Sequence, residues 1–197
     1  MDHISLKDKV SLEEYGVELH LVRHGQDEED KLGGWSENHL IDRGIEAVKK
    51  LKDEIDDDYD LFISSDLIRT IETSEILNEK LNMDIIFDPD FREVNNGVLK
   101  NMTKEEFKQK YDGLYFRSLK MDESYPEGES PNQFFNRIKN ALIRLLEHNR
   151  NKKILLVTHG GVITVILCLV YGYDYTNTVK IAPKTATITK LKCEFNL

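Results

Sequence analysis

The sequence is poor in cysteine and proline, and each shortage removes a class of protein. Its 197 residues include two cysteines and four prolines. The cysteines, Cys168 and Cys193, form no CxxC pair, which excludes a disulfide framework and favours a reduced setting. With so few prolines, no Pro/Gly/Ser-rich stretch and no internal repeat, the sequence contains no linker that would divide the chain. We therefore expect a single domain over residues 1–197.

Long hydrophobic runs and an excess of positive charge are also missing. The most apolar stretch, residues 162–171, is too short to span a bilayer. Residues 1–16 contain acids throughout and lack the apolar core of a signal peptide. The net charge is −9, whereas a generic nucleic-acid binder needs a basic surface. We expect a soluble cytoplasmic protein that binds neither nucleic acid nor a membrane, and nothing in the sequence indicates an oligomeric state.

Short apolar runs alternate with longer helical patterns, which is typical of a largely parallel sheet with helices between its strands. Runs at 17–22, 61–64 and 154–158 predict strands, and the last is apolar enough to be buried on both faces. Shorter runs at 84–87 and 186–189 predict peripheral strands. The predicted fold class is α/β: a three-layer α/β/α sandwich with a mostly parallel sheet and a small helical cap.

Three segments carry helical patterns. Apolar side chains recur at helical spacing within 45–55 and 68–77. Residues 130–133, Ser-Pro-Asn-Gln, form the capping box of a third helix, and the apolar stripe over 134–146 follows it. Residues 101–128 mix aromatic side chains with charges. This mixture fits either a cap over a pocket or loosely packed helices.

Polar side chains follow the predicted strands at their carboxyl ends, where open α/β sheets bind ligands. Arg23 and His24 follow the first strand, and Arg69 comes shortly after the second. His159 follows the most apolar strand, and Glu93 lies beyond one of the peripheral strands. Two histidines, two arginines and a carboxylate are therefore expected to converge on one crevice.

This set of side chains suits phosphoryl transfer. Arginine forks bind phosphoryl oxygens bidentately, and a histidine can act as the nucleophile. A carboxylic acid can protonate the departing oxygen and later deprotonate an attacking water. Glycines after a strand, such as Gly160, let backbone N–H groups approach an anion at the start of a helix. The expected partner is a small-molecule phosphate ester.

Ordered motifs run along nearly the whole chain. They are Leu-Val-Arg-His-Gly at 21–25, Gly-Trp at 34–35, Ser-Ser-Asp-Leu-Ile-Arg-Thr at 64–70, Arg-Glu at 92–93, Tyr-Pro-Glu-Gly-Glu-Ser at 125–130, and Val-Thr-His-Gly-Gly at 157–161. In order and spacing they resemble the motifs of the histidine phosphatase superfamily, also called the phosphoglycerate-mutase-like or branch 1 group.

The resemblance implies a role for each candidate residue. It implies that His24 attacks phosphorus and forms a phosphohistidine, and that Glu93 is first the general acid and then the base. The groups expected to hold the substrate are Arg23, Arg69, His159, Gly160 and Gln26. The resemblance implies neither a metal ion nor an organic cofactor.

The loop after the nucleophile departs from the family pattern. Asp27 follows Gln26 where Glu-Ser or Glu-Thr is common, and Asp30 stands where an asparagine would contact the phosphate. A carboxylate at that position repels phosphate unless it is turned away, protonated or paired with Lys31. We therefore hypothesise a preference for substrates of low negative charge or with a cationic portion.

Other residues carry less specific signals. His20 and His24 are four positions apart on a predicted strand, a span of roughly 13 Å that is too long for one metal ion. Trp35 is expected either to pack in the core or to shape the pocket, and Cys168 to fill the core. The remaining histidines, His3, His39 and His148, are expected at the surface.

The predicted activity is hydrolysis of a small phosphomonoester through a phosphohistidine. One alternative is an isomerase of the phosphoglycerate-mutase type, although such mutases are typically longer around the acid loop. A second alternative is a non-catalytic protein that binds a phosphate ligand or acts as a scaffold. The altered loop at 27–30 supports that alternative, whereas the intact set of histidines, arginines and glutamate argues against it.

Overall fold

Five strands form one sheet in the computed structural model, which describes residues 3–4 and 9–192. The strands are β1 (Glu18–Arg23), β2 (Leu61–Ser64), β3 (Ile85–Phe87), β4 (Lys153–Thr158) and β5 (Thr187–Leu191). Their order is β3-β2-β4-β1-β5, and every pairing is parallel except that of β5 with β1. The mostly parallel sheet and the peripheral position of the two short strands are confirmed.

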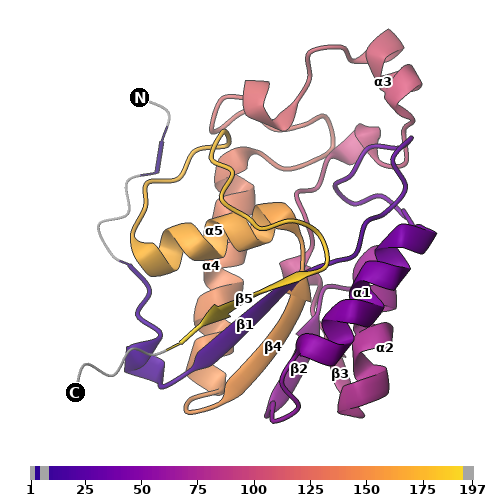
Figure 1. The fold of residues 1–197 in the computed structure, drawn as a ribbon. Helices are drawn as coiled ribbons and strands as arrows, with labels where there is room; N and C mark the ends of the chain where they lie inside the picture. Colours follow the sequence, from indigo (N-terminus) through magenta and orange to yellow (C-terminus); the bar gives the residue numbers. More distant parts are fainter. Residues whose placement is uncertain (1–2, 5–8, 193–197) are drawn as a thin grey trace.

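Helices cover both faces of the sheet (Figure 1). On one face lie α1 (Asp42–Glu54) and α2 (Ile68–Leu81), and on the other α4 (Pro131–His148) and α5 (Gly160–Tyr171). β4 shows why its sequence is continuously apolar. Ile154 and Leu156 belong to the core cluster that contains α4 and α5, whereas Leu155 and Val157 belong to the cluster on the α1 and α2 side.

The helix α4 begins as its sequence predicts. The Ser130 hydroxyl accepts a hydrogen bond from the Gln133 N–H, and the Gln133 side chain accepts one from the Ser130 N–H. Pro131 occupies the first helical position. α5, by contrast, is buried from Val162 to Leu169, and Cys168 lies within this core. Cys193 lies outside the described residues.

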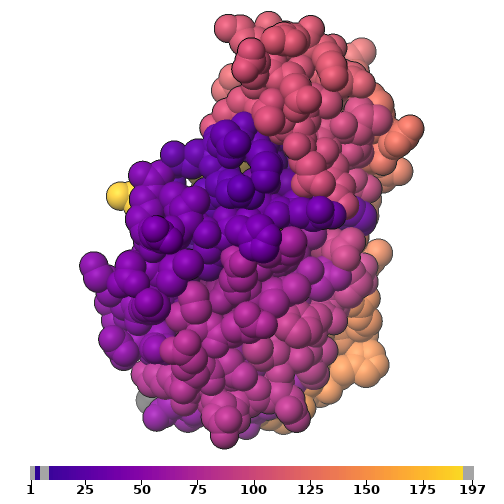
Figure 2. Space-filling model, turned by 90° about the vertical axis from the view of Figure 1, so that its right-hand side faces the viewer, coloured from indigo at the N-terminus to yellow at the C-terminus, as the bar shows by residue number. Residues whose placement is uncertain are grey.

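The segment after β3 rises above the carboxyl ends of the strands (Figure 1). It contains the short helix α3 (Lys104–Lys110) and 3-10 turns at Gly97–Leu99 and Phe116–Ser118. Its own small core consists of Leu99, Phe107, Leu119 and Tyr125. Figure 2 shows this segment as a lobe at the top of the molecule, above the loop that follows β1.

Parallel pairing aligns the residues that follow three neighbouring strands. In the register of the sheet, Arg23 lies opposite Thr158, and Ser64 lies opposite Val157. His24, Ser65 and His159 are the next residues along these strands, so the topology brings them to one edge of the sheet. No helix in the described part of the chain is long and apolar enough to cross a membrane.

Candidate active site

The proposed nucleophile lies directly after β1. His24 is 6% exposed, and its backbone N–H donates to the Thr158 carbonyl oxygen of β4 at 3.0 Å. Its Nδ1 lies 2.7 Å from the Gly25 carbonyl oxygen. Because a carbonyl oxygen only accepts hydrogen bonds, Nδ1 carries the proton and Nε2 keeps its lone pair. The ring is therefore held in the tautomer that a nucleophilic Nε2 requires.

The second histidine follows β4 and packs beside the first. The ring centroids of His24 and His159 are 5.2 Å apart, and His159 is fully buried. Its Nε2 lies 2.8 Å from the Ser65 hydroxyl, whereas its Nδ1 is buried without a hydrogen-bond partner. Ser65 belongs to the motif at 64–70, but the sequence assigned it no role. Its position directly after β2, the neighbour of β4, could have indicated that it lies in the site.

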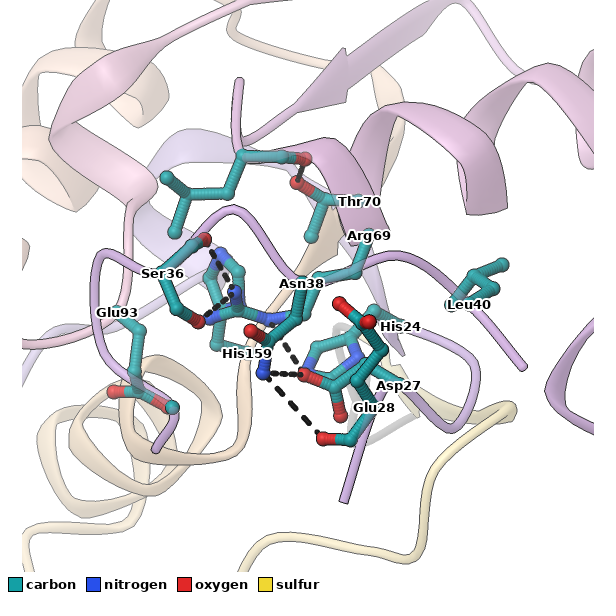
Figure 3. A network of polar contacts seen from close by, with 12 residues as sticks. His24, Asp27, Glu28, Ser36, Asn38, Leu40, Arg69, Thr70, Glu93 and His159 are labelled. Carbon is teal, nitrogen blue, oxygen red and sulfur yellow. Dashed lines mark hydrogen bonds and ion pairs between the residues drawn. The ribbon is translucent and has the colours of Figure 1, made fainter. Parts of the chain in front are cut away.

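Arg69 is brought into the site by the first turn of α2 and is 2% exposed. Its guanidinium donates to the Gly34 carbonyl oxygen at 2.7 Å and to the Ser36 carbonyl oxygen at 3.2 Å. Its Nε lies 3.6 Å from an oxygen of Asp27. Figure 3 shows the contacts of Arg69 with Ser36 and Asp27 beside the two histidines. The two carbonyl groups fix the orientation of the positive charge.

Arg23 is the last residue of β1 and directly precedes His24. Its Nη1 donates to the Pro183 carbonyl oxygen at 2.9 Å, and its Nε is buried without a partner. Gly160 lies against this guanidinium, since a Cβ at that position would stand 3.1 Å from Arg23 Cζ. The glycine therefore allows the arginine to pack on the start of α5.

Burial and positive neighbours keep both histidines neutral. Burial lowers the pKa of His24 and of His159 well below the ordinary value, and the charge of Arg69 lowers both further. Arginine itself stays protonated. The centre therefore combines two fixed cations with two neutral imidazoles, an arrangement that an anionic ligand would balance.

Glu93 reaches the site from the loop after β3. Its Oε2 accepts the Gly161 N–H at 2.9 Å, and its Oε1 accepts the Val94 N–H at 3.1 Å. A Cβ at Gly161 would overlap Glu93 Oε1, so this close approach requires glycine. In Figure 3, Glu93 lies at one side of the labelled group and His24 at the other.

Two side chains anchor the loop that carries Glu93. The Trp35 indole donates to the Glu93 carbonyl oxygen at 2.7 Å, and Arg137 donates to the same oxygen at 3.1 Å. The guanidinium of Arg92 lies 4.7 Å from the centre of the Trp35 ring. Sequence reasoning gave Arg137 no role, because its position on α4 shows only an amphipathic helix and not what its polar face meets.

The acidic loop after the nucleophile is largely neutralised by its own partners. Each of three acids contacts side chains nearby: Asp27 contacts Arg69 and Asn38, Glu28 contacts Lys31, and Glu29 contacts Arg43 and Gln26. The Gln26 side chain is thus engaged with Glu29 and does not join the two histidines. Asp30 is exposed, and its carbonyl oxygen accepts the Lys104 N–H. Among the four acids, only Asp27 contacts a cation of the site.

Unsatisfied buried polar atoms concentrate at this site. In the described residues they are Arg23 Nε, His159 Nδ1, Asn38 Oδ1 and Asn132 Oδ1. Buried polar atoms in proteins normally have partners, so each exception calls for a reason. Arg23 Nε is a donor, and His159 Nδ1 can be one. A ligand rich in acceptor oxygens, such as a phosphoryl group, would satisfy both.

A cavity of about 460 Å³ opens beside the centre, and Arg23, Glu93 and Gly160 contribute to its lining. A larger hollow, of about 560 Å³, lies between residues 9–13 and the end of α5. None of the phosphate-binding candidates lines the larger hollow, and for this reason we place the substrate in the smaller one.

The buried histidine at the other end of β1 belongs to a separate cluster. Possible ligand atoms of Glu18, His20 and Asp56 lie within 4.8 Å of one another, the arrangement in the described residues that could hold a metal ion. However, Lys153 and Lys190 already approach Asp56 to 2.9 and 2.8 Å. The positive charges of these lysines balance the Asp56 carboxylate in place of a metal ion. The three remaining histidines, His3, His39 and His148, are exposed as expected.

Comparison with known proteins gives a consistent family. Residues 19–196 match the model of the histidine phosphatase superfamily (branch 1). The chain is 29% identical over 158 residues to the Bacillus subtilis "Uncharacterized phosphatase PhoE", covering 78% of this chain and 77% of that protein. It is 32% identical over 168 residues to the Proteus mirabilis "Probable phosphoglycerate mutase GpmB", covering 79% and 75%.

The fold is similar to that of a mycobacterial glucosyl-3-phosphoglycerate phosphatase solved in complex with VO3. The TM-score is 0.72 at 20% identity, over 89% of this chain and 92% of that one. At this identity the likeness concerns the fold alone.

Proposed function

The chain belongs to branch 1 of the histidine phosphatase superfamily, and from this premise we propose that it hydrolyses a small phosphomonoester through a phosphohistidine at His24. The observation that carries the proposal is the state of the two neighbouring imidazoles. His24 presents a lone pair at Nε2 because its Nδ1 donates to the Gly25 carbonyl oxygen. Beside it, His159 Nδ1 and Arg23 Nε are buried without partners.

In the first step, His24 Nε2 attacks phosphorus as the bond from phosphorus to the ester oxygen breaks. Arg23, Arg69 and His159 bind the phosphoryl oxygens, on which negative charge is spread during the transfer. In this arrangement His159 Nδ1 is protonated and donates a hydrogen bond to a phosphoryl oxygen, while His159 Nε2 accepts a hydrogen bond from the Ser65 hydroxyl. Glu93 in its acid form gives a proton to the departing alcohol oxygen.

In the second step, water attacks the phosphohistidine. The Glu93 carboxylate takes one proton from the water, the new oxygen–phosphorus bond forms, and the bond from phosphorus to Nε2 breaks. Inorganic phosphate leaves, and both His24 and Glu93 return to their starting states. The protein supplies every proton carrier in this cycle, so the mechanism needs no metal ion.

The test is phosphate release from p-nitrophenyl phosphate by the purified protein, with and without EDTA. We expect turnover by the wild type in both conditions and its loss in His24→Asn. His148→Asn is the matched control, because His148 is exposed at the end of α4 and should leave turnover unchanged. Equal rates for the wild type and His24→Asn would contradict the proposal, and would favour a non-catalytic phosphate-binding protein.

Phosphoglycerate mutase activity is the second candidate, because the GpmB relative carries that name. A mutase returns the phosphoryl group from His24 to a bound product, whereas the proposed phosphatase transfers it to water. Incubation with 3-phosphoglycerate and 2,3-bisphosphoglycerate separates the two. We expect no conversion of 3-phosphoglycerate into 2-phosphoglycerate, and an equilibrium mixture of the two without net release of inorganic phosphate would favour the mutase.

A further inference from the structure

The cavity of about 460 Å³ beside the catalytic centre has a distinct chemical character on the side away from the phosphoryl residues. Arg23 and Glu93 line its inner end, where the ester bond would be cleaved. The remaining lining includes the polar residues Thr164, Asn177 and Lys180, and its apolar and aromatic part consists of Val94, Phe116, Phe134, Tyr175, Val179 and Ala182. Its volume lies within the range of roughly 300–1,000 Å³ that is usual for small-molecule sites.

The aromatic wall of this cavity is fixed by packing. Phe116, from the lobe above the sheet, meets Phe134 of α4 edge-on at 5.9 Å between ring centroids. Tyr175 packs against Phe135 at 5.0 Å, and it is 2% exposed. Burial raises the pKa of Tyr175, and the charge of Glu93 raises it further, so its hydroxyl stays neutral. The wall is therefore preformed, and it is shaped for a flat apolar group.

Two polar side chains of the wall, Thr164 and Asn177, donate hydrogen bonds within the protein. The Thr164 hydroxyl donates to the Gly160 carbonyl oxygen at 3.0 Å. The Asn177 amide donates to the carbonyl oxygens of Phe116 and Leu119, at 2.6 and 2.8 Å. A leaving group with many hydroxyls would lose its hydrogen bonds to water here and regain few from the wall, which costs free energy.

Few charged side chains line the cavity. Lys180 is the cation of the outer lining, and it is exposed to solvent. A second phosphate group would need a cluster of buried or bidentate donors such as Arg23 and Arg69 form at the catalytic centre. The acids of the loop after His24, residues 27–30, do not line this cavity. They therefore do not set the preference for a cationic leaving group that their sequence position suggested.

We propose that this cavity holds the leaving group, and that the substrate is the monophosphate ester of an apolar, ring-bearing alcohol. This inference rests on the proposed function, and it names the class of ester that the same site hydrolyses. Phe116, Tyr175 and Val179 hold the ring, while the ester oxygen lies next to Glu93. Sugar phosphates and bisphosphates are poor substrates, because the wall neither replaces their hydrogen bonds nor balances a second dianion.

The test compares kcat/KM for 2-phenylethyl phosphate, glucose 6-phosphate and glycerol 3-phosphate. All three are esters of primary alcohols, so differences in leaving-group reactivity are small and the recognition of the alcohol dominates. We expect 2-phenylethyl phosphate to exceed both others by at least about tenfold, the order of discrimination that an apolar pocket provides.

Two variants on one loop sharpen the comparison. Val179→Asp places a charge in the cavity and should abolish the preference for 2-phenylethyl phosphate. Ile181→Asp, two residues further on, changes a side chain that is 41% exposed and does not line the cavity, so it should keep the preference. Equal effects of the two substitutions would overturn the inference.

The outcomes separate this inference from the proposed function. If the wild type releases phosphate from p-nitrophenyl phosphate and prefers glucose 6-phosphate or glycerol 3-phosphate, the apolar class is wrong and the phosphatase stands. If no ester is hydrolysed and p-nitrophenyl phosphate is also stable, the proposed function is wrong, and the inference falls with it.

Discussion

One buried histidine, His20, lies within β1 and another, His24, follows its last residue, and the two differ in how far their hydrogen-bonding capacity is used. His20 has both ring nitrogens engaged, with Tyr59 at 2.8 Å and Glu18 at 2.7 Å. His24, four residues later, has only its Nδ1 engaged, and its neighbour His159 leaves Nδ1 without a partner. Both histidines are at most 6% exposed, so burial does not distinguish them.

The difference lies in the surrounding charges. Around His20, the carboxylates of Glu18, Asp56 and Asp58 face Lys153, Lys190 and Lys192, so the cluster balances three negative charges with three positive ones. Around His24, two arginines face a single contacting carboxylate, Asp27. A closed polar cluster stabilises the fold, whereas an open one retains donors and positive charge for a ligand. The same residue type is therefore expected to be structural near the start of β1 and catalytic directly after its end.

The strongest way to break this comparison is the same substitution at both ends of β1. We expect His24→Asn to lower kcat by roughly 10⁴-fold or more, since it removes the nucleophile. His20→Asn should keep kcat within about twofold and lower the free energy of unfolding by about 1–3 kcal/mol, because Tyr59 and Glu18 lose a buried partner. Phosphate release and urea unfolding measure the two effects. A large loss of kcat in folded His20→Asn would contradict the division.

The next effect concerns the positive charge of Arg69, which lies beside His24. Arg69→Gln should lower kcat/KM by roughly 10²–10³-fold, because Arg69 stabilises the charge on the transferring group. Arg144→Gln is the control, since Arg144 forms exposed ion pairs with Asp88 and Asp90. Steady-state kinetics on 2-phenylethyl phosphate or p-nitrophenyl phosphate measure the ratio. A similar, small decrease in both variants would show that Arg69 is only a structural ion-pair partner.

The pH dependence of the free energy of unfolding tests His20, His24 and His159 together. The pKa values of His20, His24 and His159 are all lowered in the folded state, chiefly by burial. The unfolded chain therefore binds more protons below about pH 6.5. Consequently the free energy of unfolding should fall as the pH drops from 6.5 towards 5, by up to about 1.4 kcal/mol per pH unit for each histidine.

Urea unfolding at several pH values measures this slope. The double variant His24→Asn/His159→Asn should have a shallower slope than the wild type between pH 6.5 and 5, since two proton-binding differences are removed. An unchanged slope would show that these two histidines are not neutral in the folded protein. Carboxylates such as Asp56, whose pKa Lys153 lowers, contribute only at more acidic pH.

The smallest effect concerns Asp27, which departs from the family pattern and lies 3.6 Å from Arg69. Asp27→Asn keeps the shape of the side chain and removes its charge, so we expect phosphate and vanadate to inhibit the variant at roughly three- to tenfold lower concentration. Asp30→Asn is the control on the same loop, because Asp30 is exposed. Tighter inhibition of Asp30→Asn than of Asp27→Asn would reverse this assignment.

Much of the fold follows from local sequence patterns. The strand at 61–64 was predicted with its observed bounds, and the capping box at 130–133 forms as expected. The same rule applied to Thr103 and Glu106 would have located the start of α3. The candidate catalytic set could also be assembled from the sequence, because each member follows a strand or opens a helix, and parallel pairing brings strand ends together.

The leaving-group cavity could not be predicted in the same way. Its apolar walls come from four separate parts of the chain, at Val94, at Phe116, at Phe134, and at the segment that carries Tyr175 and Val179. Side-chain packing between these segments, and not any local periodicity, decides which of them face the substrate. For the same reason, the sequence showed the acids at 27–30 but not that Lys31, Arg43 and Arg69 would pair with three of them.

The central claim is that His24 at the open end of β1 accepts the phosphoryl group. Rapid acid-free quenching with a ³²P-labelled phosphomonoester, followed by peptide mapping, tests it most directly. We predict a phosphate bound to His24 that survives alkali and is released by acid, present in the wild type and in His20→Asn, and absent in His24→Asn. Turnover by the wild type with no labelled His24, or with label on another residue, would contradict the account.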